Sequence, residues 1–249
     1  MMNTKQYYKD LITKWIDEEK QKLCSIESKD RYLQNHGKRF EYLSNLCKTL
    51  NSDKSAKILD IGRSDLSVLL TKYYSNVTTL GLDLEIDKGG HREREIIDLK
   101  HIVFDLNESK NVKKWIDEKF DLIVYSEVLE HIYEAPEFSL LFLNYLLNSD
   151  GFIICTTPNA ASLYRRLKLL LGKNTISRIR FHNLNPAHYR EYTKEELIQT
   201  AEMCELKVAK HQYICFYDDS DSFKSRIFNF ITNVVPSFRW SQVLILRKK

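Results

Sequence analysis

The sequence predicts an α/β fold in which a mostly parallel β-sheet is covered by helices on both faces. From residue 56 onward, short apolar runs rich in β-branched residues alternate with polar or helical stretches. The runs are almost continuously apolar, which indicates strands that are buried on both faces. The chain has 249 residues, 43% of them hydrophobic and 29% charged, which suits one globular domain with a full core.

Residues 1–55 are expected to form an N-terminal helical extension of the same domain. Apolar side chains at helical spacing predict two helices, at residues 7–22 and 31–50. Packing against the sheet is the simplest role for these helices, and a lid over a ligand is the alternative.

Five strands follow in order, at residues 56–62, 77–83, 101–105, 120–125 and 151–157. Between the last two of them, Pro136 suits the first turn of a helix whose apolar stripe begins at Phe138. Thr193 and Glu196 form a capping box that starts a further helix. Two late strands are expected at about 206–216 and 242–247.

The cysteines indicate a reducing compartment. There are five of them, widely spaced and without a C-x-x-C pair, so free thiols are the simplest interpretation. We find no signal peptide and no apolar run long enough to span a membrane, and we therefore expect a cytoplasmic protein. The net charge of +4 does not by itself imply nucleic acid as a partner.

Acidic residues end three of the predicted strands, at Asp60, Asp83 and Asp105. Ligands of open α/β sheets bind beyond the carboxyl ends of the strands. Asp83 can accept hydrogen bonds from ribose hydroxyls, and Asp105 from an adenine amino group, while Gly62 permits a tight turn. Taken singly, each Asp is better explained as a helix cap or a turn residue.

The phosphate-binding pattern G-x-G-x-x-G is missing, since residues 62–66 read Gly-Arg-Ser-Asp-Leu. A pyrophosphate would find no close-packed cradle there. S-adenosylmethionine carries no phosphate and needs only the turn. The omission therefore favours S-adenosylmethionine over NAD, although an acidic residue after the second strand suits both.

Residues 58–62, 81–83 and 104–106 resemble the first three motifs of the class I S-adenosylmethionine-dependent methyltransferases. Residues 120–132 and 151–159 are similar to the FDxIxxxEVLEH and GGxLxxxTPN segments of one branch. The resemblance implies a Rossmann-like seven-stranded sheet over residues 56–249, with an antiparallel last strand and an acceptor-side insert at about 159–192. It implies a cofactor site made of Asp60, Ile61, Gly62, Asp83, Leu84, Asp105, Leu106 and Ser126.

Three features depart from the family pattern. The family often has glycine where this chain has Ser64 and Leu66. In addition, residues 88–91 interrupt the helix that usually follows the second strand.

Methyl transfer to a hydroxyl needs a base or a metal for the developing charge. His131 and Glu127 are the catalytic candidates, because they follow the fourth strand on the acceptor side. If helical, Glu127, Glu130 and His131 share one face. Together with His188 they resemble the sites of two metal-using branches, the ubiquinone-type and the small-RNA 2′-O-methyltransferases, which implies a divalent metal such as Mg, Mn or Zn. The alternative is a run that caps a helix and packs the cofactor loop without any metal.

The acceptor side is strongly basic. Residues 151–190 contain no Asp or Glu, and they contain seven Lys and Arg residues, at positions 165, 166, 168, 173, 178, 180 and 190. Such a field suits a phosphate- or carboxylate-bearing acceptor, and a solvated basic face is the alternative. Leu163, Leu167, Leu170 and Leu171 would form the other face of a basic amphipathic helix, which also suits a membrane surface or a lipid-linked substrate. Residues 223–240 show a similar pattern, for which core packing is the plainer explanation.

Three functions stay open at this point. The leading one is O-methylation of a sugar, a lipid-linked glycan or a small-metabolite hydroxyl, because the motifs look like those of methyltransferases from polysaccharide and secondary-metabolite pathways. The second is a metal-dependent RNA 2′-O-methyltransferase, against which stand the modest net charge and the absence of an RNA-binding module; we do not expect nucleic acid as the partner. The third is a catalytically silent scaffold, supported only by Ser64 and Leu66.

Overall fold

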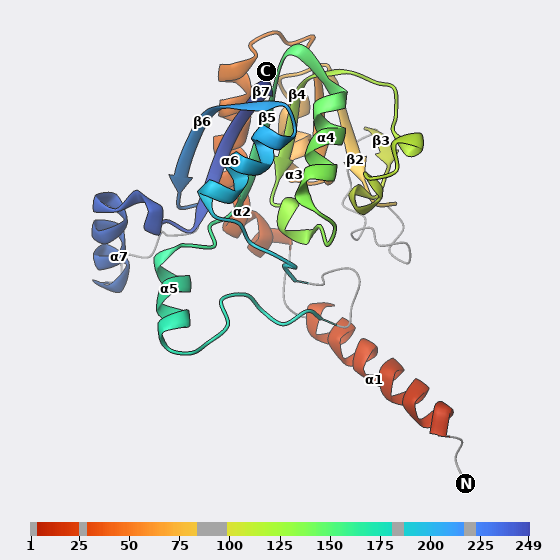
Figure 1. Cartoon of the computed structure of the whole chain (residues 1–249), viewed down its shortest axis with the longest axis vertical. Helices are drawn as coiled ribbons and strands as arrows, with labels where there is room; N and C mark the ends of the chain where they lie inside the picture. Colours follow the sequence, from red (N-terminus) through yellow and green to blue (C-terminus); the bar gives the residue numbers. More distant parts are fainter. Residues whose placement is uncertain (1–3, 25–28, 84–98, 181–186, 217–222) are drawn as a thin grey trace.

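A single seven-stranded sheet organises the molecule (Figure 1). The computed structural model describes residues 4–24, 29–83, 99–180, 187–216 and 223–249. The strands follow one another across the sheet in the order β3-β2-β1-β4-β5-β7-β6. Their bounds are Lys57–Ile61 (β1), Asn76–Gly81 (β2), Lys100–Val103 (β3), Phe120–Ser126 (β4), Leu147–Pro158 (β5), Leu206–Ile214 (β6) and Ser241–Lys248 (β7).

The sheet is parallel except for β7, which runs antiparallel to both of its neighbours, β5 and β6. The predicted fold class, with an antiparallel last strand, is therefore confirmed. The strand order reverses between β1 and β4, because the chain first builds outward to β3 and then returns to the other side. A ligand site is expected beyond the carboxyl ends of the strands at this reversal.

Helices cover both faces of the sheet, as predicted, and each face has its own apolar core. On one face, α2 and α3 bury Phe40, Leu43 and Leu70 against β1 and β4. On the other face, α4 and α6 bury Phe142, Leu197 and their neighbours. The helix bounds are Thr4–Cys24 (α1), Lys29–Leu50 (α2), Asp65–Thr71 (α3), Pro136–Leu146 (α4), Leu163–Leu170 (α5), Lys194–Met203 (α6) and Phe223–Val234 (α7).

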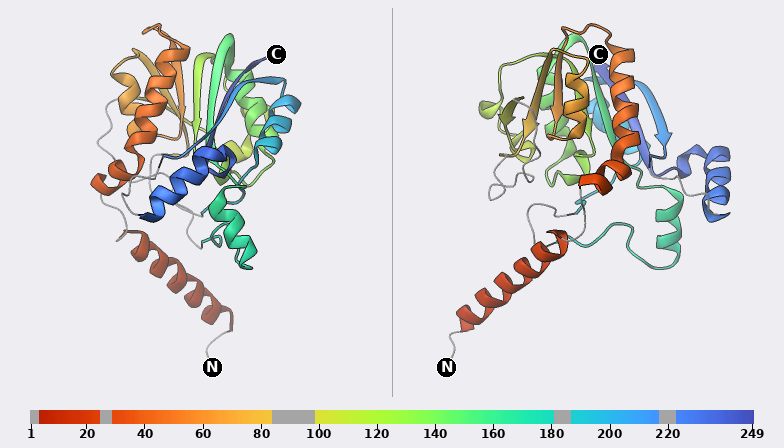
Figure 2. Two further views of the ribbon diagram at one scale, coloured as in Figure 1. Left: turned by 90° about the vertical axis from the view of Figure 1, so that its left-hand side faces the viewer. Right: turned by 180° about the vertical axis from the view of Figure 1, so that it is seen from behind.

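Short 3₁₀ turns occupy the connections between these elements. They are Leu106–Glu108 (η2), Val112–Lys114 (η3), Leu129–His131 (η4) and Pro236–Phe238 (η5). Three helices, α1, α5 and α7, lie beyond one end of the sheet rather than on its faces (Figures 1 and 2). Among the described residues, no helix is both long and apolar enough to cross a bilayer.

The predicted elements are present, with shifted ends. β2 and β3 end at Gly81 and Val103, so Asp83 and Asp105 lie just beyond the strands. β5 begins at Leu147, directly after α4 and four residues before the predicted start. Gly151 allows this tight entry, because a Cβ there would lie 2.8 Å from the Leu147 side chain and 2.9 Å from the Asp121 carbonyl oxygen. Leu84 and residues 88–91 lie outside the described residues.

Three of the described cysteines lie in the apolar core. Cys47, Cys155 and Cys204 are buried and free. The capping box at the start of α6 is also confirmed, since Thr193 and Glu196 exchange both hydrogen bonds.

Candidate active site

Three carboxylates lie at one edge of the sheet. Asp60 is the last but one residue of β1. Asp83 lies two residues after the end of β2, and Asp105 lies two residues after the end of β3. Because β1, β2 and β3 are parallel neighbours, their carboxyl ends meet at the same edge. The three acidic residues therefore share one edge of the sheet, and their convergence on a single ligand stays a prediction.

The turn after β1 is built around Asp60 and Gly62. Gly62 has a φ of +80°, and its N–H donates to the carbonyl of Leu80 at 2.8 Å. Asp60 is buried and accepts a hydrogen bond from the Ser67 hydroxyl at 2.6 Å. Burial raises the pKa of Asp60 to about 7, while the Ser67 hydrogen bond and the charge of Arg39 oppose the rise. The turn thus holds a carboxyl that changes charge near neutral pH.

The two departures from the family's glycines have structural roles. Ser64 is the N-cap of α3, where its hydroxyl accepts from the Leu66 N–H and its own N–H donates to the Ser67 hydroxyl. Leu66 and Ile61 are buried in the core, so Ile61 can offer a ligand only its backbone. Helix capping and core packing account for Ser64 and Leu66, and this removes the one observation that favoured a silent scaffold.

The end of β2 is fixed by a histidine from β3. His101 Nδ1 lies 2.8 Å from the Thr79 hydroxyl, and its Nε2 lies 3.0 Å from the Leu82 carbonyl oxygen. Leu82 immediately precedes Asp83, which is partly exposed. His101 therefore positions the backbone that carries the predicted ribose-binding carboxylate.

Asp105 serves as a helix cap, which is the alternative that the sequence analysis kept for it. Its Oδ1 accepts hydrogen bonds from the backbone and side-chain N–H groups of Asn107, at 2.9 and 3.0 Å. Leu106 is buried beneath this turn. Contact of Asp105 and Leu106 with an adenine stays a prediction.

Glu127 is not helical, so the expected helix face of Glu127, Glu130 and His131 is wrong. Its φ of 54° is left-handed, because the chain turns sharply where β4 ends, and only Leu129–His131 form a short 3₁₀ turn. The Glu127 carboxylate accepts from the Thr156 hydroxyl at 3.0 Å, and that hydroxyl also lies 2.9 Å from the Ser126 hydroxyl. Glu127 and Ser126 are thereby tied to β5.

Arg39, which the sequence analysis did not single out, reaches this edge from α2. Its guanidinium lies 3.6 Å from a Glu127 carboxylate oxygen, and its side chain is only 7% exposed. The same charge opposes the rise that burial causes in the pKa of Asp60 and of Glu130. Helix α2, which we expected only to pack against the sheet, therefore supplies a buried cation to the site. No local sequence motif around residue 39 indicates this role.

Glu130 is a fully buried carboxyl group on the acceptor side. Its Oε2 accepts from the Thr157 hydroxyl at 3.0 Å, while Oε1 has no hydrogen-bond partner among the described residues. Burial, together with the nearby charge of Glu127, raises the pKa of Glu130 well above its usual range. Without a bound cation, Glu130 is therefore expected to carry a proton.

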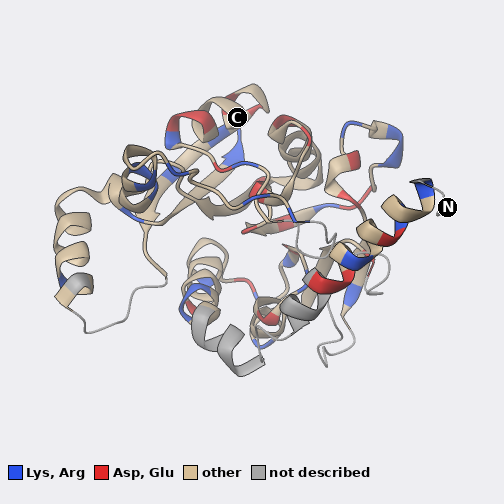
Figure 3. Ribbon diagram, turned by 90° about the horizontal axis from the view of Figure 1, so that it is seen from below, with Lys and Arg blue, Asp and Glu red and all other residues tan. Residues whose placement is uncertain are grey.

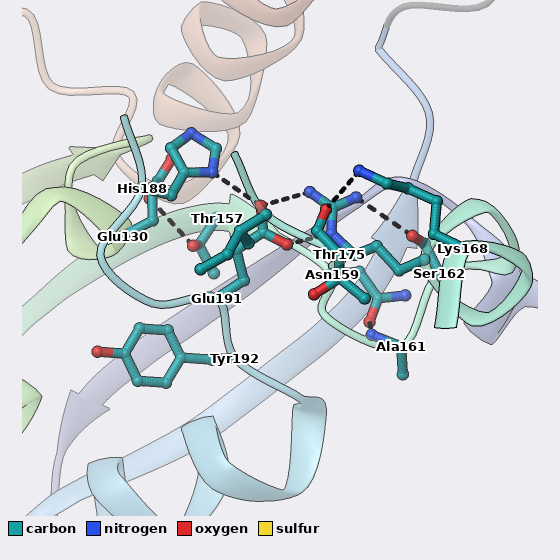
Figure 4. Close-up of polar contacts among 12 residues, drawn as sticks. Glu130, Thr157, Asn159, Ala161, Ser162, Lys168, Thr175, His188, Glu191 and Tyr192 are labelled. Carbon is teal, nitrogen blue, oxygen red and sulfur yellow. Dashed lines mark hydrogen bonds and ion pairs between the residues drawn. The ribbon is translucent and has the colours of Figure 1, made fainter. Parts of the chain in front are cut away.

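Figure 4 shows His188 beside Glu130, and a second histidine, His131, packs against His188. The rings of His131 and His188 lie edge to face, with 5.0 Å between their centroids. His131 Nδ1 lies 3.1 Å from the carbonyl oxygen of Ala187, whose own φ is +71°. The His188 Nδ1 lies 2.7 Å from a carboxylate oxygen of Glu191. The predicted candidates His131, Glu130 and His188 thus come together, and Glu127 is not part of this group.

Glu191 and Arg165 form the support behind His188; the sequence placed Arg165 only in a basic field on the acceptor side, and it did not single out Glu191. Arg165 on α5 makes two hydrogen bonds to Glu191, and both side chains are buried. Burial alone would raise the pKa of Glu191, but hydrogen bonds from His188 and Arg165 more than offset it, so the pKa is lowered. One signal was available, since Glu191 is the first acidic residue after the acid-free stretch 151–190.

The basic stretch is partly neutralised. Arg165 points inward to Glu191, and Arg190 pairs with Glu196 at 2.5 Å. The expectation that these cations form the polar face of α5, opposite its leucines, is therefore wrong for Arg165. It is the buried residue of α5, whereas Leu167 and Leu170 are exposed.

The group Glu130, His131 and His188 has the composition of a divalent-metal site. One ligand atom from each lies within 4.8 Å of the others. Two imidazoles and a carboxylate are a ligand set that first-row metals accept. The unsatisfied Oε1 of Glu130 fits this use, because a cation would hold that carboxyl in its ionised form.

Comparison with known proteins decides the family. The family model described as "Methyltransferase domain" matches residues 34–211, which is more than half of the chain. This chain belongs to the methyltransferase domain family. The match begins inside α2, within the segment that we expected to be an extension. No curated protein matches the methyltransferase chain.

Several solved structures share the fold of this chain. An S-adenosylmethionine-dependent methyltransferase from Clostridium acetobutylicum aligns with a TM-score of 0.57 at 13% identity, covering 99% of each chain. A 1,6-didemethyltoxoflavin-N1-methyltransferase from Burkholderia thailandensis aligns with a TM-score of 0.55 at 14% identity, covering 100% of this chain and 92% of the other. An S-adenosylmethionine-dependent methyltransferase from Archaeoglobus fulgidus aligns with a TM-score of 0.54 at 16% identity, covering 87% of this chain and 99% of the other.

The predicted enzyme class is confirmed by the family and the fold. The chain is a class I methyltransferase, and its methyl donor is S-adenosylmethionine, as the motifs indicated. The branch of the family, the acceptor and the atom that is methylated are finer questions, which the geometry of the site can address.

Proposed function

We propose that this methyltransferase transfers a methyl group from S-adenosylmethionine to a hydroxyl of a sugar, lipid-linked glycan or small metabolite. The donor would lie over Gly62 at the ends of β1, β2 and β3. The carboxyl groups of Asp60 and Glu127 lie there, and both interact with the charge of Arg39. A donor whose sulfonium and ammonium groups outweigh its one carboxylate suits such surroundings.

The pairing of His188 with Glu191 is the observation that carries O-methylation. Since Nδ1 bonds to a carboxylate that Arg165 keeps ionised, the ring proton belongs on Nδ1 and the lone pair on Nε2. The same side chain is 32% exposed, so an acceptor can reach it. Amine acceptors that bind in their neutral form have less need of such a base.

Side chains of this protein are enough to take up the proton that the reaction releases. The acceptor oxygen attacks the methyl carbon in line, the carbon–sulfur bond breaks, and the donor leaves as neutral S-adenosylhomocysteine. His188 Nε2 takes the hydroxyl proton, and the Glu191 carboxylate stabilises the imidazolium that forms. His131, edge to face with His188, would line the same acceptor pocket.

Glu127 and Ser126 are better suited to positioning than to proton transfer. The Glu127 carboxylate is held by Thr156 and Arg39. We assign both residues to the wall between donor and acceptor, which agrees with the cofactor role expected for Ser126.

A metal-assisted transfer to an RNA 2′-hydroxyl is the second candidate function. The group Glu130, His131 and His188 favours it, with three ligands instead of the four expected. A bound divalent ion would stabilise the alkoxide that attacks the methyl group. In that case His188 would be a ligand and could not serve as the base.

Methyl-transfer assays with the purified protein separate these functions. The acceptors should include sugar phosphates, hydroxylated carboxylic acids, matched amines and a short RNA, each with and without a chelator. Chelator-resistant methylation of a hydroxyl supports the first proposal, and activity on RNA that a chelator abolishes supports the second. Methylation of the amines alone would contradict both, and failure to bind the donor in calorimetry would return the silent scaffold to consideration.

A further inference from the structure

Two helices beyond the end of the sheet expose large apolar side chains. On α5 and in the turn that follows it, Leu167, Leu169, Leu170 and Leu171 are between 49% and 82% exposed. On α7, Phe223, Ile227, Phe230 and Val234 are between 45% and 77% exposed. We call these eight residues the α5–α7 patch. Isolated apolar side chains on a surface are ordinary, whereas a contiguous set marks an interaction site.

The exposed residues of α7 form one continuous stripe. Phe223, Ile227, Phe230 and Val234 are spaced by four, three and four residues, so they lie on the same side of the helix. The side that faces the protein has its own apolar contacts, such as that between Phe228 and Trp240 at 5.8 Å. Core packing, the plainer explanation from the sequence, therefore accounts only for Phe228 and Ile231 among the six apolar residues of α7.

The two helices are held next to each other by η5 and by Trp240, which follows it. Trp240 contacts Tyr164 of α5 at 4.9 Å and Phe228 of α7 at 5.8 Å, and Phe238 lies against the Arg166 guanidinium. The views in Figures 1 and 2 agree that α5 and α7 are neighbours. Their apolar side chains therefore belong to one end of the molecule.

The two helices of the patch carry basic charges only, while Asp218, Asp219 and Asp221 precede α7 in a segment outside the described residues. Neither residues 151–190 nor residues 223–249 contain Asp or Glu. Arg166, Lys173 and Arg226 are exposed next to the apolar stripes. Figure 3 accordingly shows no acidic residue on either helix. A protein partner that covered this patch would need a matching acidic rim, whereas an anionic bilayer supplies apolar depth and negative charge together.

We infer that the α5–α7 patch docks this methyltransferase on an anionic phospholipid surface. The Leu and Phe side chains enter the boundary between headgroups and acyl chains, and the Lys and Arg side chains contact the headgroup phosphates. This association does not depend on methyl transfer, so it can be tested without an acceptor.

Docking would also bring the acceptor site to the membrane. Arg165 is the one buried residue of α5, and it joins the helix to Glu191 and through it to His188. The candidate base therefore lies at the inner side of the same helix whose outer side meets the lipid. An amphiphilic acceptor held in the bilayer would reach His188 along α5.

Vesicle co-sedimentation of the full-length protein tests the inference. The probes are phosphatidylcholine vesicles and vesicles in which part of the phosphatidylcholine is replaced by phosphatidylglycerol. We expect binding to the anionic vesicles that weakens with added salt, and at least tenfold weaker binding of the Leu170→Glu, Phe230→Glu double variant.

Matched controls come from exposed apolar residues elsewhere. Met203→Glu and Val112→Glu make the same chemical change at side chains that are 69% and 64% exposed, away from the patch. These variants should bind as the unchanged protein does. No binding to anionic vesicles, or binding that Leu170→Glu and Phe230→Glu leave intact, would overturn the inference. So would a dimer in sedimentation that the double variant dissociates, since the patch would then join two copies.

Discussion

The donor side and the acceptor side of this site are built differently. On the donor side, Asp60, Asp83 and Asp105 come from three consecutive strands, and each belongs to a short motif. The acceptor side is built from three separate segments. Arg165 comes from α5, His188 and Glu191 come from the loop before α6, and Glu130 comes from the turn after β4. The first arrangement follows from the order of strands in a sheet, and the second only from contacts between distant segments.

This difference separates two kinds of substitution. Changes on the donor side should alter the affinity for S-adenosylmethionine, and changes on the acceptor side should alter kcat or stability.

Replacing His188 by Ala should lower kcat by about 100- to 1,000-fold, because the acceptor hydroxyl loses its base. The dissociation constant of S-adenosylmethionine, measured by calorimetry in the same variant, should stay unchanged. Added imidazole should restore part of the activity, which a purely structural role would not allow. Equal losses of kcat and donor affinity would mean that the two sides are not separate.

Glu191→Gln should lower the free energy of unfolding by about 3 kcal/mol at neutral pH, because it strips the buried Arg165 of its counter-charge. The pKa of Glu191 is lowered in the folded protein. Ionised Glu191 therefore stabilises the folded state at pH values above the ordinary carboxyl pKa, and this stabilisation is lost as the pH falls through the lowered pKa. Urea titrations at neutral and at acid pH should therefore show the difference shrinking in acid.

Glu196→Gln is the matched control for that experiment. It removes the charge of an exposed pair with Arg190, and glutamine can keep the capping box at Thr193. We expect a change below about 1 kcal/mol. A loss as large as that of Glu191→Gln would show that burial is not what distinguishes the two pairs.

The affinity for S-adenosylmethionine should rise with pH up to about 7, by at most about tenfold per unit, and then level off. The reason is that burial raises the pKa of Asp60 to about 7, and a cationic donor binds the ionised form better. Asp60→Asn should bind more weakly and without this pH dependence. In the protein without donor, the free energy of unfolding should fall as the pH rises toward 7, because the buried Asp60 must then lose its proton. The Asp60→Asn variant should not show this fall.

His101→Asn should weaken donor binding by about threefold to tenfold, because the Leu82 carbonyl next to Asp83 loses its imidazole partner. Calorimetry at a fixed pH measures the change. Unaltered affinity would show that the end of β2 is held without this histidine.

The strands of the donor side could be predicted from the sequence because they depend on local order, while the contacts of their end residues with the donor stay predictions. Buried strands and the residues after them fix Asp60, Gly62 and Asp83 at one edge once the sheet is parallel. The capping box of α6 and the start of α4 at Pro136 were predictable for the same reason.

The acceptor side could be predicted only in part. His131, Glu130 and His188 were found through a family pattern, but the helix assumed for Glu127 fails because the chain adopts a left-handed turn there. Arg39 and Arg165 could not be found, since one approaches from α2 and the other turns inward from a helix whose leucines face outward. Such contacts depend on how distant segments pack, which periodicity does not encode.

The position of β7 in the sheet has a consequence for biosynthesis. This strand lies between β5 and β6, yet it follows both of them in the chain. Until residues 241–248 have left the ribosome, β5 and β6 each present an open edge where a neighbour belongs. The nascent chain can complete its first five strands early, but the half that carries His188 and Glu191 must wait for the last strand or be guarded by a chaperone.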